Sequence, residues 1–170
     1  MHDIYIFDFD YTLYKTSETV LVWSPRGDHE VGGKKCFRLL PSIFAQYKIS
    51  SDEEINEESF LNFYSIDFDK ALEIKPCLEI FNLVDKKIIL SARPPDAAKS
   101  FYEKHGNICE FIGLKNSSSK AKLDVIKSFK NPLVFEDSSF VIDELVKNKI
   151  DCVHVISEAV NKINLNYNIF

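Results

Sequence analysis

The chain has 170 residues, of which 45% are hydrophobic and 28% are charged, and its formal net charge is −5. This length suffices for one well-packed domain with an insertion and is too short for two full domains. No apolar run approaches the roughly 20 residues that a transmembrane helix needs, so we expect no membrane partner. The negative net charge disfavours non-specific binding to nucleic acid over the whole surface.

The amino terminus and the cysteines favour a cytoplasmic location. The first predicted strand begins within a few residues of Met1, which leaves no room for a secretory signal peptide. The cysteines, Cys36, Cys77, Cys109 and Cys152, form no Cys-x-x-Cys pair. Such wide spacing favours reduced, buried thiols over a zinc site or a redox motif.

The first predicted strand ends in two acids. Residues 4–7 (Ile-Tyr-Ile-Phe) have the composition of a strand buried on both faces of a parallel sheet. Because side chains alternate along a strand, Asp8 and Asp10 are expected to project to the same side. Ligands of open α/β sheets bind at the carboxyl ends of the strands, so this pair predicts a functional site. The alternative is that the acids simply end the strand and face water.

A long insertion follows this strand. We assign residues 14–75 to a small cap, and residues 1–13 together with 76–170 to the core domain. Within the insertion, residues 24–28 (Ser-Pro-Arg-Gly-Asp) and Gly32-Gly33 predict tight turns. The polypeptide therefore leaves the core before any crossover helix can form.

The insertion is predicted to be helical. Apolar residues recur at helical spacing over residues 37–47 and again over residues 55–64. Residues 51–54 (Ser-Asp-Glu-Glu) have the composition of a capped start for the second helix. Basic residues prevail in the first half of the insertion and acidic residues in the second, so the basic half is a candidate surface for a phosphorylated substrate.

Strands and helices alternate in the rest of the chain. The predicted strands are 87–90, 109–112, 132–135 and 152–156, and the predicted helices are 95–105, 120–129 and 140–147. This alternation with short connections predicts an α/β fold, a doubly wound (Rossmann-like) parallel sheet covered on both sides. The tail after residue 156 fits neither pattern clearly.

Polar residues suited to phosphate chemistry follow three of these strands. They are Asp8 to Thr12, Ser91 to Pro94 and Glu136 to Ser139, and Lys120 opens a helix between the last two. A phosphoryl group in transfer needs cations and N–H donors around its oxygens and a nucleophile in line with the leaving oxygen. The ammonium of Lys120, the hydroxyl of Ser91 and the backbone N–H groups that begin at Ala92 can bind the phosphate.

The acids can supply the nucleophile, a metal site and the proton. Asp8 can form an aspartyl-phosphate. Mg²⁺ prefers a few carboxylate ligands, and Asp8 with Asp137 or Glu136 would provide them. Asp10 would then protonate the leaving alcohol and later activate water.

These residues resemble the motifs of the haloacid dehalogenase superfamily. Asp8-Phe9-Asp10-Tyr11-Thr12 resembles its first motif, Asp-x-Asp-x-Thr, and the strand ending in Ser91 resembles its second. Lys120 resembles the third motif, and Phe135 to Ser138 resembles the acidic fourth. The resemblance covers residues 3 to about 156 and leaves out the insertion and the tail.

The resemblance implies a Mg²⁺-dependent phosphatase. Asp8 would be the nucleophile and a metal ligand, and Asp10 the general acid/base and a ligand through its backbone carbonyl. Asp137 and Glu136 would complete the metal site, and Ser91 with Lys120 would hold the phosphate. The dehalogenases of the superfamily are less similar, because they lack the second aspartate.

Some positions depart from the family pattern or leave alternatives. Tyr11 stands where Gly is common, so it either narrows the entrance or stacks on a substrate. Lys122 is an alternative to Lys120, which we prefer because it opens the helix. Asp143 is an alternative to Glu136. Arg93 is either a substrate contact, to a second phosphate or a carboxylate, or part of a surface ion pair.

Three functions are compatible with this sequence. The first is a phosphomonoester hydrolase acting on a nucleotide, a nucleic-acid end or a small phosphometabolite. The second is a non-catalytic binding or regulatory module of the same fold, and the third is a phosphoaccepting receiver domain. The intact acids and lysines speak against the second, and an insertion directly after the first strand suits a receiver poorly.

Overall fold

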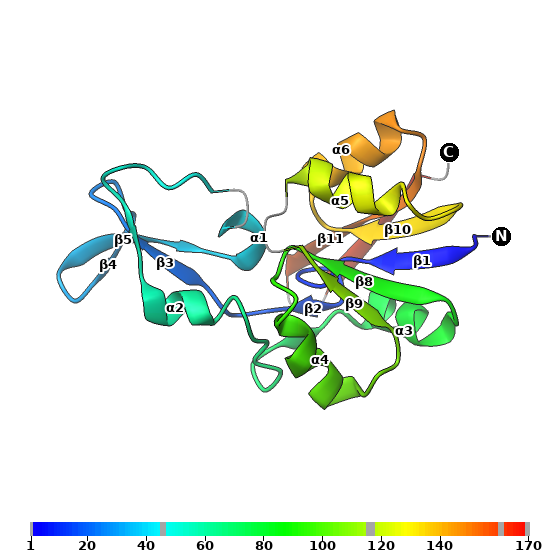
Figure 1. The fold of residues 1–170 in the computed structure, drawn as a ribbon, viewed down its shortest axis with the longest axis horizontal. Helices are drawn as coiled ribbons and strands as arrows, with labels where there is room; N and C mark the ends of the chain where they lie inside the picture. The colour runs from blue at the N-terminus through cyan, green and yellow to red at the C-terminus, as the bar shows by residue number, and fades with distance from the viewer. Residues whose placement is uncertain (1, 45–46, 115–117, 160–161, 169–170) are drawn as a thin grey trace.

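The computed structural model describes residues 2–44, 47–114, 118–159 and 162–168. Its central sheet has six strands (Figure 1), with five parallel strands and an antiparallel one at the edge. In spatial order they are β12 (Lys162–Asn168), β11 (Asp151–Ala159), β10 (Pro132–Glu136), β1 (Ile4–Phe7), β8 (Lys87–Ser91) and β9 (Glu110–Gly113). The first strand of the chain therefore lies in the middle of the sheet, which is consistent with a Rossmann-like α/β fold.

Helices cover both faces of this sheet. They are α3 (Lys75–Leu83), α4 (Ala97–His105), α5 (Ser119–Ile126) and α6 (Ser139–Lys147). In Figure 1, α5 and α6 lie above the sheet, and α3 and α4 lie below it. Alternation along β1 supplies both layers, because Phe7 packs with α3 and α4 whereas Ile6 packs with α5 and α6. The strands and helices predicted for the core are confirmed, apart from shifts of a few residues at their ends.

The edge strand β12 and the helix α3 are the core elements that the sequence did not predict. The tail folds back beside β11 as an antiparallel strand, with Val153 opposite Tyr167. The helix α3 begins with Pro76 in its first turn, where the missing N–H costs nothing. It buries Cys77 and Phe81 and brings the chain from the insertion back to the sheet.

The insertion is mainly a β-sheet, so the prediction of a helical cap is wrong. Its sheet consists of β4 (His29–Val31), β5 (Lys34–Leu39), β3 (Val20–Trp23) and β6 (Glu54–Ile55), in that order. A second, two-stranded sheet of β2 (Tyr14–Lys15) and β7 (Leu72–Glu73) lies at its base. The two helices are short: α1 (Pro41–Phe44) and α2 (Glu57–Leu61).

Strand pairing overrides the helical spacing in the insertion. Gly32 and Gly33 have φ angles of 58° and 78°, the conformation that a two-residue hairpin turn requires, and they join β4 to β5. Within this hairpin, residues 34–39 form a β-strand. We had predicted that a helix begins in this region. The cap prediction for the second helix also fails, because Asn56 caps α2 by accepting a hydrogen bond from the Ser59 N–H at 2.8 Å.

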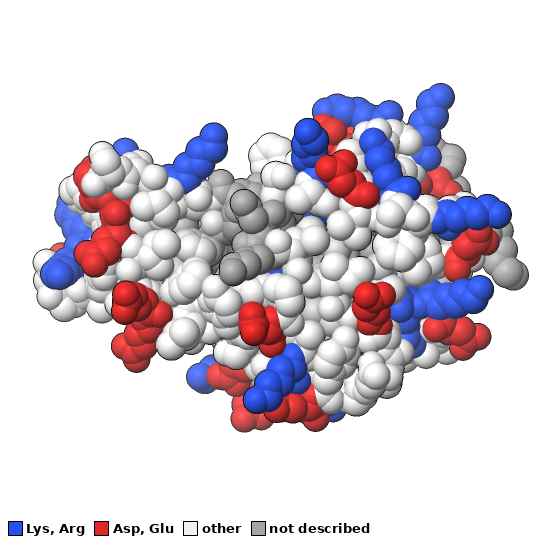
Figure 2. All heavy atoms as spheres, viewed as in Figure 1, with Lys and Arg blue, Asp and Glu red and all other residues white. Residues whose placement is uncertain are grey.

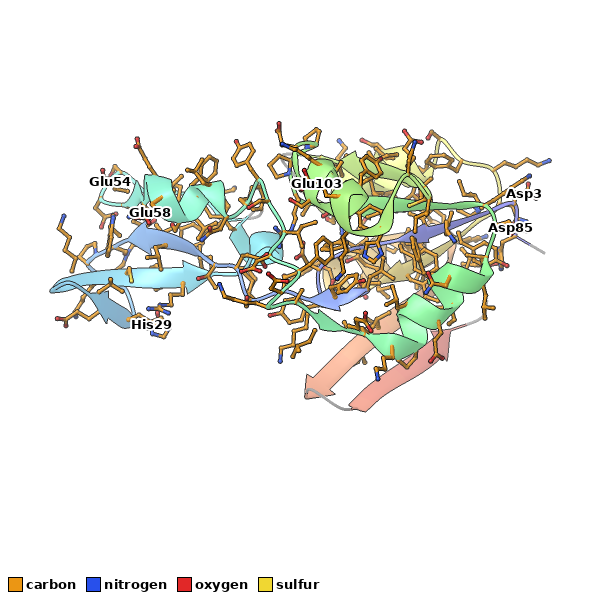
Figure 3. The ribbon with its side chains drawn as sticks, turned by 90° about the horizontal axis from the view of Figure 1, so that it is seen from below. Asp3, His29, Glu54, Glu58, Asp85 and Glu103 are labelled. Carbon is orange, nitrogen blue, oxygen red and sulfur yellow. The ribbon has the colours of Figure 1, made fainter. Side chains whose placement is uncertain are left out.

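The molecule is elongated, with the insertion at one end. Figure 3 shows His29, Glu54 and Glu58 at the insertion end, and Asp3 and Asp85 at the far end of the core. On the face shown in Figure 2, acidic and basic side chains are interspersed over both ends. Among the described ranges, none of the helices is long and apolar enough to cross a membrane.

Candidate functional site

Two carboxylates meet where β1 and β10 end. Phe7 pairs with Phe135, and the Asp8 N–H donates to the Phe135 carbonyl at 2.9 Å, so the pairing continues past the end of β1. Glu136 is the last residue of β10. The parallel register therefore places Asp8 beside Glu136 at the carboxyl edge of the sheet, where ligands bind in open α/β folds.

Lys122 lies between these two acids. Its Nζ donates to Asp8 Oδ1 at 2.8 Å and to Glu136 Oε2 at 2.7 Å. All three side chains are buried. Burial opposes the charge on Lys122, but the carboxylates of Asp8 and Glu136 hold the pKa of Lys122 above its usual value of 10.5.

A third acid, Asp137, completes the cluster. Carboxylate oxygens of Asp8, Glu136 and Asp137 lie within 4.8 Å of one another. Burial, with the neighbouring Glu136 carboxylate next in importance, raises the pKa of Asp8 to about 7, and Lys122 opposes this rise. Burial and the charges of Asp8 and Glu136 also raise the pKa of Asp137. One ammonium thus faces three carboxylates.

This excess of negative charge suits a cation. Asp137 Oδ1 is buried and has no hydrogen-bond partner among the described residues. A buried acceptor without a partner costs free energy unless a ligand satisfies it. Hard cations such as Mg²⁺ take carboxylate oxygens as ligands, so the donor set of Asp8, Glu136 and Asp137 fits the predicted metal.

Asp10 belongs to a different cluster. Arg93 donates to both of its carboxylate oxygens, from Nε to Oδ2 at 2.9 Å and from Nη2 to Oδ1 at 2.8 Å. The Thr16 hydroxyl donates to Oδ1 at 2.6 Å. Asp10 is buried, so Arg93 and Thr16 hold its carboxylate in one orientation.

Arg93 does not contact solvent, which corrects its assignment as a substrate contact. Its side chain is 0% exposed. Besides Asp10, Nη2 donates to Glu18 at 3.3 Å, and Nη1 donates to the carbonyls of Asn62 and Ser65. All five N–H groups of the guanidinium therefore have partners, and the alternative of a surface ion pair is wrong as well.

Of the remaining predicted phosphate ligands, Ser91 and Ala92 lie at the end of β8, and Lys120 lies on α5. Ser91 is buried at the end of β8, and its Oγ accepts the Arg93 N–H at 3.1 Å. Ala92, whose backbone N–H we assigned to the phosphate, is buried beside it. The structure brings Lys122, and not Lys120, to Asp8, because Lys120 is exposed on the first turn of α5.

Tyr11 lies beside the acidic cluster, where it lines the same pockets as Asp137. It has a φ of 60°, a left-handed conformation that is unusual outside glycine, and its N–H donates to the Tyr14 carbonyl at 2.7 Å. Burial and the charges of Asp10, Asp137 and Glu18 raise the pKa of its hydroxyl. Tyr11 and Asp137 line two adjoining pockets of about 480 and 390 Å³.

The sequence led us to prefer Lys120 over Lys122, and it did not reveal the partners of Asp10. One signal for Lys122 was available: it lies four residues before Ile126, and both are buried on one face of α5. A lysine on the apolar face of a helix is expected to reach a buried acid. No comparable signal marked Glu18, since its contact with Arg93 depends on how the insertion folds.

Comparisons of the chain with protein-family models, with curated proteins and with solved structures found no match.

Proposed function

We propose that the protein is a Mg²⁺-dependent phosphomonoester hydrolase of the haloacid dehalogenase type, built on a doubly wound core. One observation carries the proposal: Asp8, Lys122, Glu136 and Asp137 converge at the carboxyl ends of adjacent parallel strands. The four come from both halves of the core sequence, and such an arrangement of like charges is costly to maintain for stability alone.

Asp8 acts as the nucleophile. One of its oxygens attacks the phosphorus, a P–O bond forms to Asp8, and the P–O bond to the leaving alcohol breaks. Lys122 holds Asp8 in position and neutralises part of the charge in the cluster. A bound Mg²⁺, held by Asp8, Glu136 and Asp137, would supply the further positive charge that lets an anionic nucleophile approach an anionic phosphate.

Asp10 acts first as the general acid and then as the general base. Its Oδ1 accepts hydrogen bonds from Thr16 and from two nitrogens of Arg93, whereas Oδ2 accepts, among the described residues, only from Arg93 Nε. Oδ2 therefore keeps a lone pair for a proton. From Oδ2 the proton passes to the leaving oxygen; the same oxygen then takes a proton from the water that attacks the aspartyl-phosphate, and Asp8 and inorganic phosphate are released.

The substrate class is a nucleotide, a nucleic-acid end or a small phosphometabolite, acted on in the cytoplasm. We test the activity by phosphate release from a panel of such monoesters, with Mg²⁺ or with a chelator. We expect turnover only with Mg²⁺, and less than about a thousandth of it in Asp8→Asn. Lys120→Met is the matched control and should retain activity, because Lys120 is an exposed lysine on α5, the helix that carries Lys122. Full activity in Asp8→Asn would refute the assignment.

The way Arg93 holds Asp10 favours a second candidate, a non-catalytic binding module of the same fold. Asp10 can serve as an acid only if it reaches the leaving oxygen while bonded to Arg93 and Thr16. The two candidates differ in a simple measurement. A binding module would bind Mg²⁺ and phosphate esters but release no phosphate from any member of the panel.

A further inference from the structure

The larger of the two pockets beside the cluster joins the insertion to the core. It measures about 480 Å³, within the roughly 300–1,000 Å³ typical of small-molecule sites. Tyr11 and Asp137 line it, and Asp137 lies next to Asp8. A phosphate held at Asp8 would therefore direct its ester group toward this pocket or toward the smaller pocket that Tyr11 and Asp137 also line.

Apolar side chains form part of the wall of the larger pocket. Leu40 and Ile43 contribute from the insertion, and Phe140 contributes from the start of α6. Ile43 is 51% exposed and Phe140 is 69% exposed, which is unusual for large apolar residues that face the same space. A ligand that covers both would remove this apolar surface from water.

Aromatic rings also line the pocket, and charge is scarce. The rings of Tyr11, Tyr47 and Phe140 border it from three separate segments. Asp137 is the one charged side chain among the described residues that line it. A carboxylate or a second phosphate on the substrate would find no cation there, since Arg93 is buried and fully paired.

We propose that this pocket, lined by Tyr11, Leu40, Ile43, Tyr47 and Phe140, binds a flat, uncharged aromatic group on the alcohol side of the phosphate ester. The inference rests on the proposed function and narrows it. Aromatic rings favour stacked or edge-on packing against other rings, and apolar walls exclude water from such a group. The shared chemistry fits either a nucleobase or an aryl group.

The test compares substrates that share the same kind of leaving oxygen. 2-Phenylethyl phosphate and propyl phosphate both release a primary alcohol, so the ratio of their kcat/KM values reports on the phenyl group that replaces a methyl group. We expect a ratio of at least about ten. In the Ile43→Ala, Phe140→Ala double variant the ratio should fall toward one. Both residues are largely exposed, so this variant should fold.

Leu83→Ala is the matched control. Leu83 is 82% exposed at the end of α3 and does not line the pocket, so its variant should keep the wild-type ratio. A second substrate pair separates the two sources of the ring. Preference for thymidine 5′-monophosphate over deoxyribose 5-phosphate identifies a nucleobase, and preference for the phenylethyl ester alone identifies an aryl group.

The possible failures can be told apart. A ratio near one, with turnover that depends on Asp8, overturns the pocket assignment and leaves the hydrolase proposal intact. Absence of turnover overturns the hydrolase proposal, and calorimetric binding of the two esters then decides the pocket: tighter binding of the phenylethyl ester supports it, and equal or absent binding overturns it. Self-association that the double variant abolishes would assign the pocket to a second copy of this chain instead.

Discussion

Two buried charge clusters, one containing Asp8 and the other containing Asp10, differ in how fully their hydrogen-bonding groups are paired. In the first, Lys122 donates to Asp8 and Glu136, Asp137 lies beside both acids, and Asp137 Oδ1 lacks a partner among the described residues. In the second, which includes Asp10, the guanidinium of Arg93 has a partner for each N–H. The first cluster therefore has capacity for a cation, whereas in the second, within the described part of the chain, the guanidinium of Arg93 is fully paired and only Asp10 Oδ2 keeps a free lone pair.

The difference separates a cluster that can bind a cation from one in which Arg93 holds Asp10 in place. A cluster with excess negative charge and an unpaired acceptor is expected to become more stable when it binds a cation or a proton. A saturated cluster gains nothing from a ligand and instead fixes the groups that it joins. Arg93 joins the core strand end to the insertion, through Asp10 on one side and the carbonyls of Asn62 and Ser65 on the other.

The largest expected difference between the clusters is in activity. Asp8→Asn should lower phosphate release more than about a thousandfold, because it removes the nucleophile. Glu18→Gln changes an acid of the second cluster to its amide and should lower activity less than about tenfold. Initial rates with Mg²⁺ give both values. Equal losses in the two variants would remove the distinction drawn here.

Stability should depend most on the saturated cluster. Arg93→Met leaves Asp10 and Glu18 buried without their cation, and breaking a buried pair in this way costs about 3–5 kcal/mol of unfolding free energy. Lys99→Met is the control, since Lys99 is 83% exposed and its pair with Glu103 is weak. Urea unfolding measures both. Mg²⁺ at the first cluster should stabilise the wild type and Arg93→Met to the same extent. A larger stabilisation of Arg93→Met by Mg²⁺ would contradict the comparison, because it would place a metal in the second cluster.

Mg²⁺ should act on the first cluster alone. At a concentration one hundred times its Kd, Mg²⁺ should stabilise the protein by about 2.7 kcal/mol. Asp137→Asn should lose most of this effect, whereas Glu18→Gln should keep it. Thermal or urea unfolding with and without Mg²⁺ tests the difference.

The effect of Mg²⁺ should also depend on pH. The pKa of Asp8 is about 7 in the folded protein against a usual value of 3.8. Without metal, the stability that the raised pKa contributes is present at low pH and is lost as the pH rises through 7. Mg²⁺ binds the carboxylate form, so its stabilising effect should be larger at pH 8 than at pH 6. A smaller effect at pH 8 would argue against Asp8 as a ligand.

The smallest expected effect concerns a saturated carboxylate in the insertion. The Ser50 N–H and the side chains of Tyr47, Ser24 and Arg26 donate to Glu53 and lower its pKa to about 2. A lowered pKa stabilises the folded state above about pH 4.5, and this contribution is lost as the pH falls toward 2. The folded insertion should therefore become less stable as the pH falls below about 4.5.

Trp23 is the one tryptophan of the chain and lies in β3 of the insertion, so its fluorescence reports this change. Glu53→Gln is the control and should show a weaker dependence on pH over the same range. An unchanged acid transition in this variant would exclude Glu53 as its cause.

The core and the acids could be predicted from the sequence because they depend on local patterns. Apolar runs define the buried strands, and their ends place Asp8 and Glu136 at one edge. The insertion could not be predicted in the same way. Its residues 34–39 become a strand only because β3 and β4 pair with them, and spacing along one segment carries no information about such partners.

The same limit explains Arg93. The sequence places it two residues after Ser91, where a surface position and a buried position are equally compatible with its neighbours. Its burial depends on Asp10 and on carbonyls of the insertion, which lie far from it along the chain. Lys122 was predictable in principle, from the apolar face of α5.

The central position of β1 has a consequence for folding. Tyr5 pairs with Lys87 on one side and with Leu133 on the other, so the strand that carries Asp8 finds its neighbours only across long loops. Closing such loops costs entropy before any contact repays it, and a fold with many distant pairings forms slowly. During synthesis the apolar segment Ile4–Phe7 emerges well before either neighbour, and until they arrive it is exposed to aggregation or to chaperones.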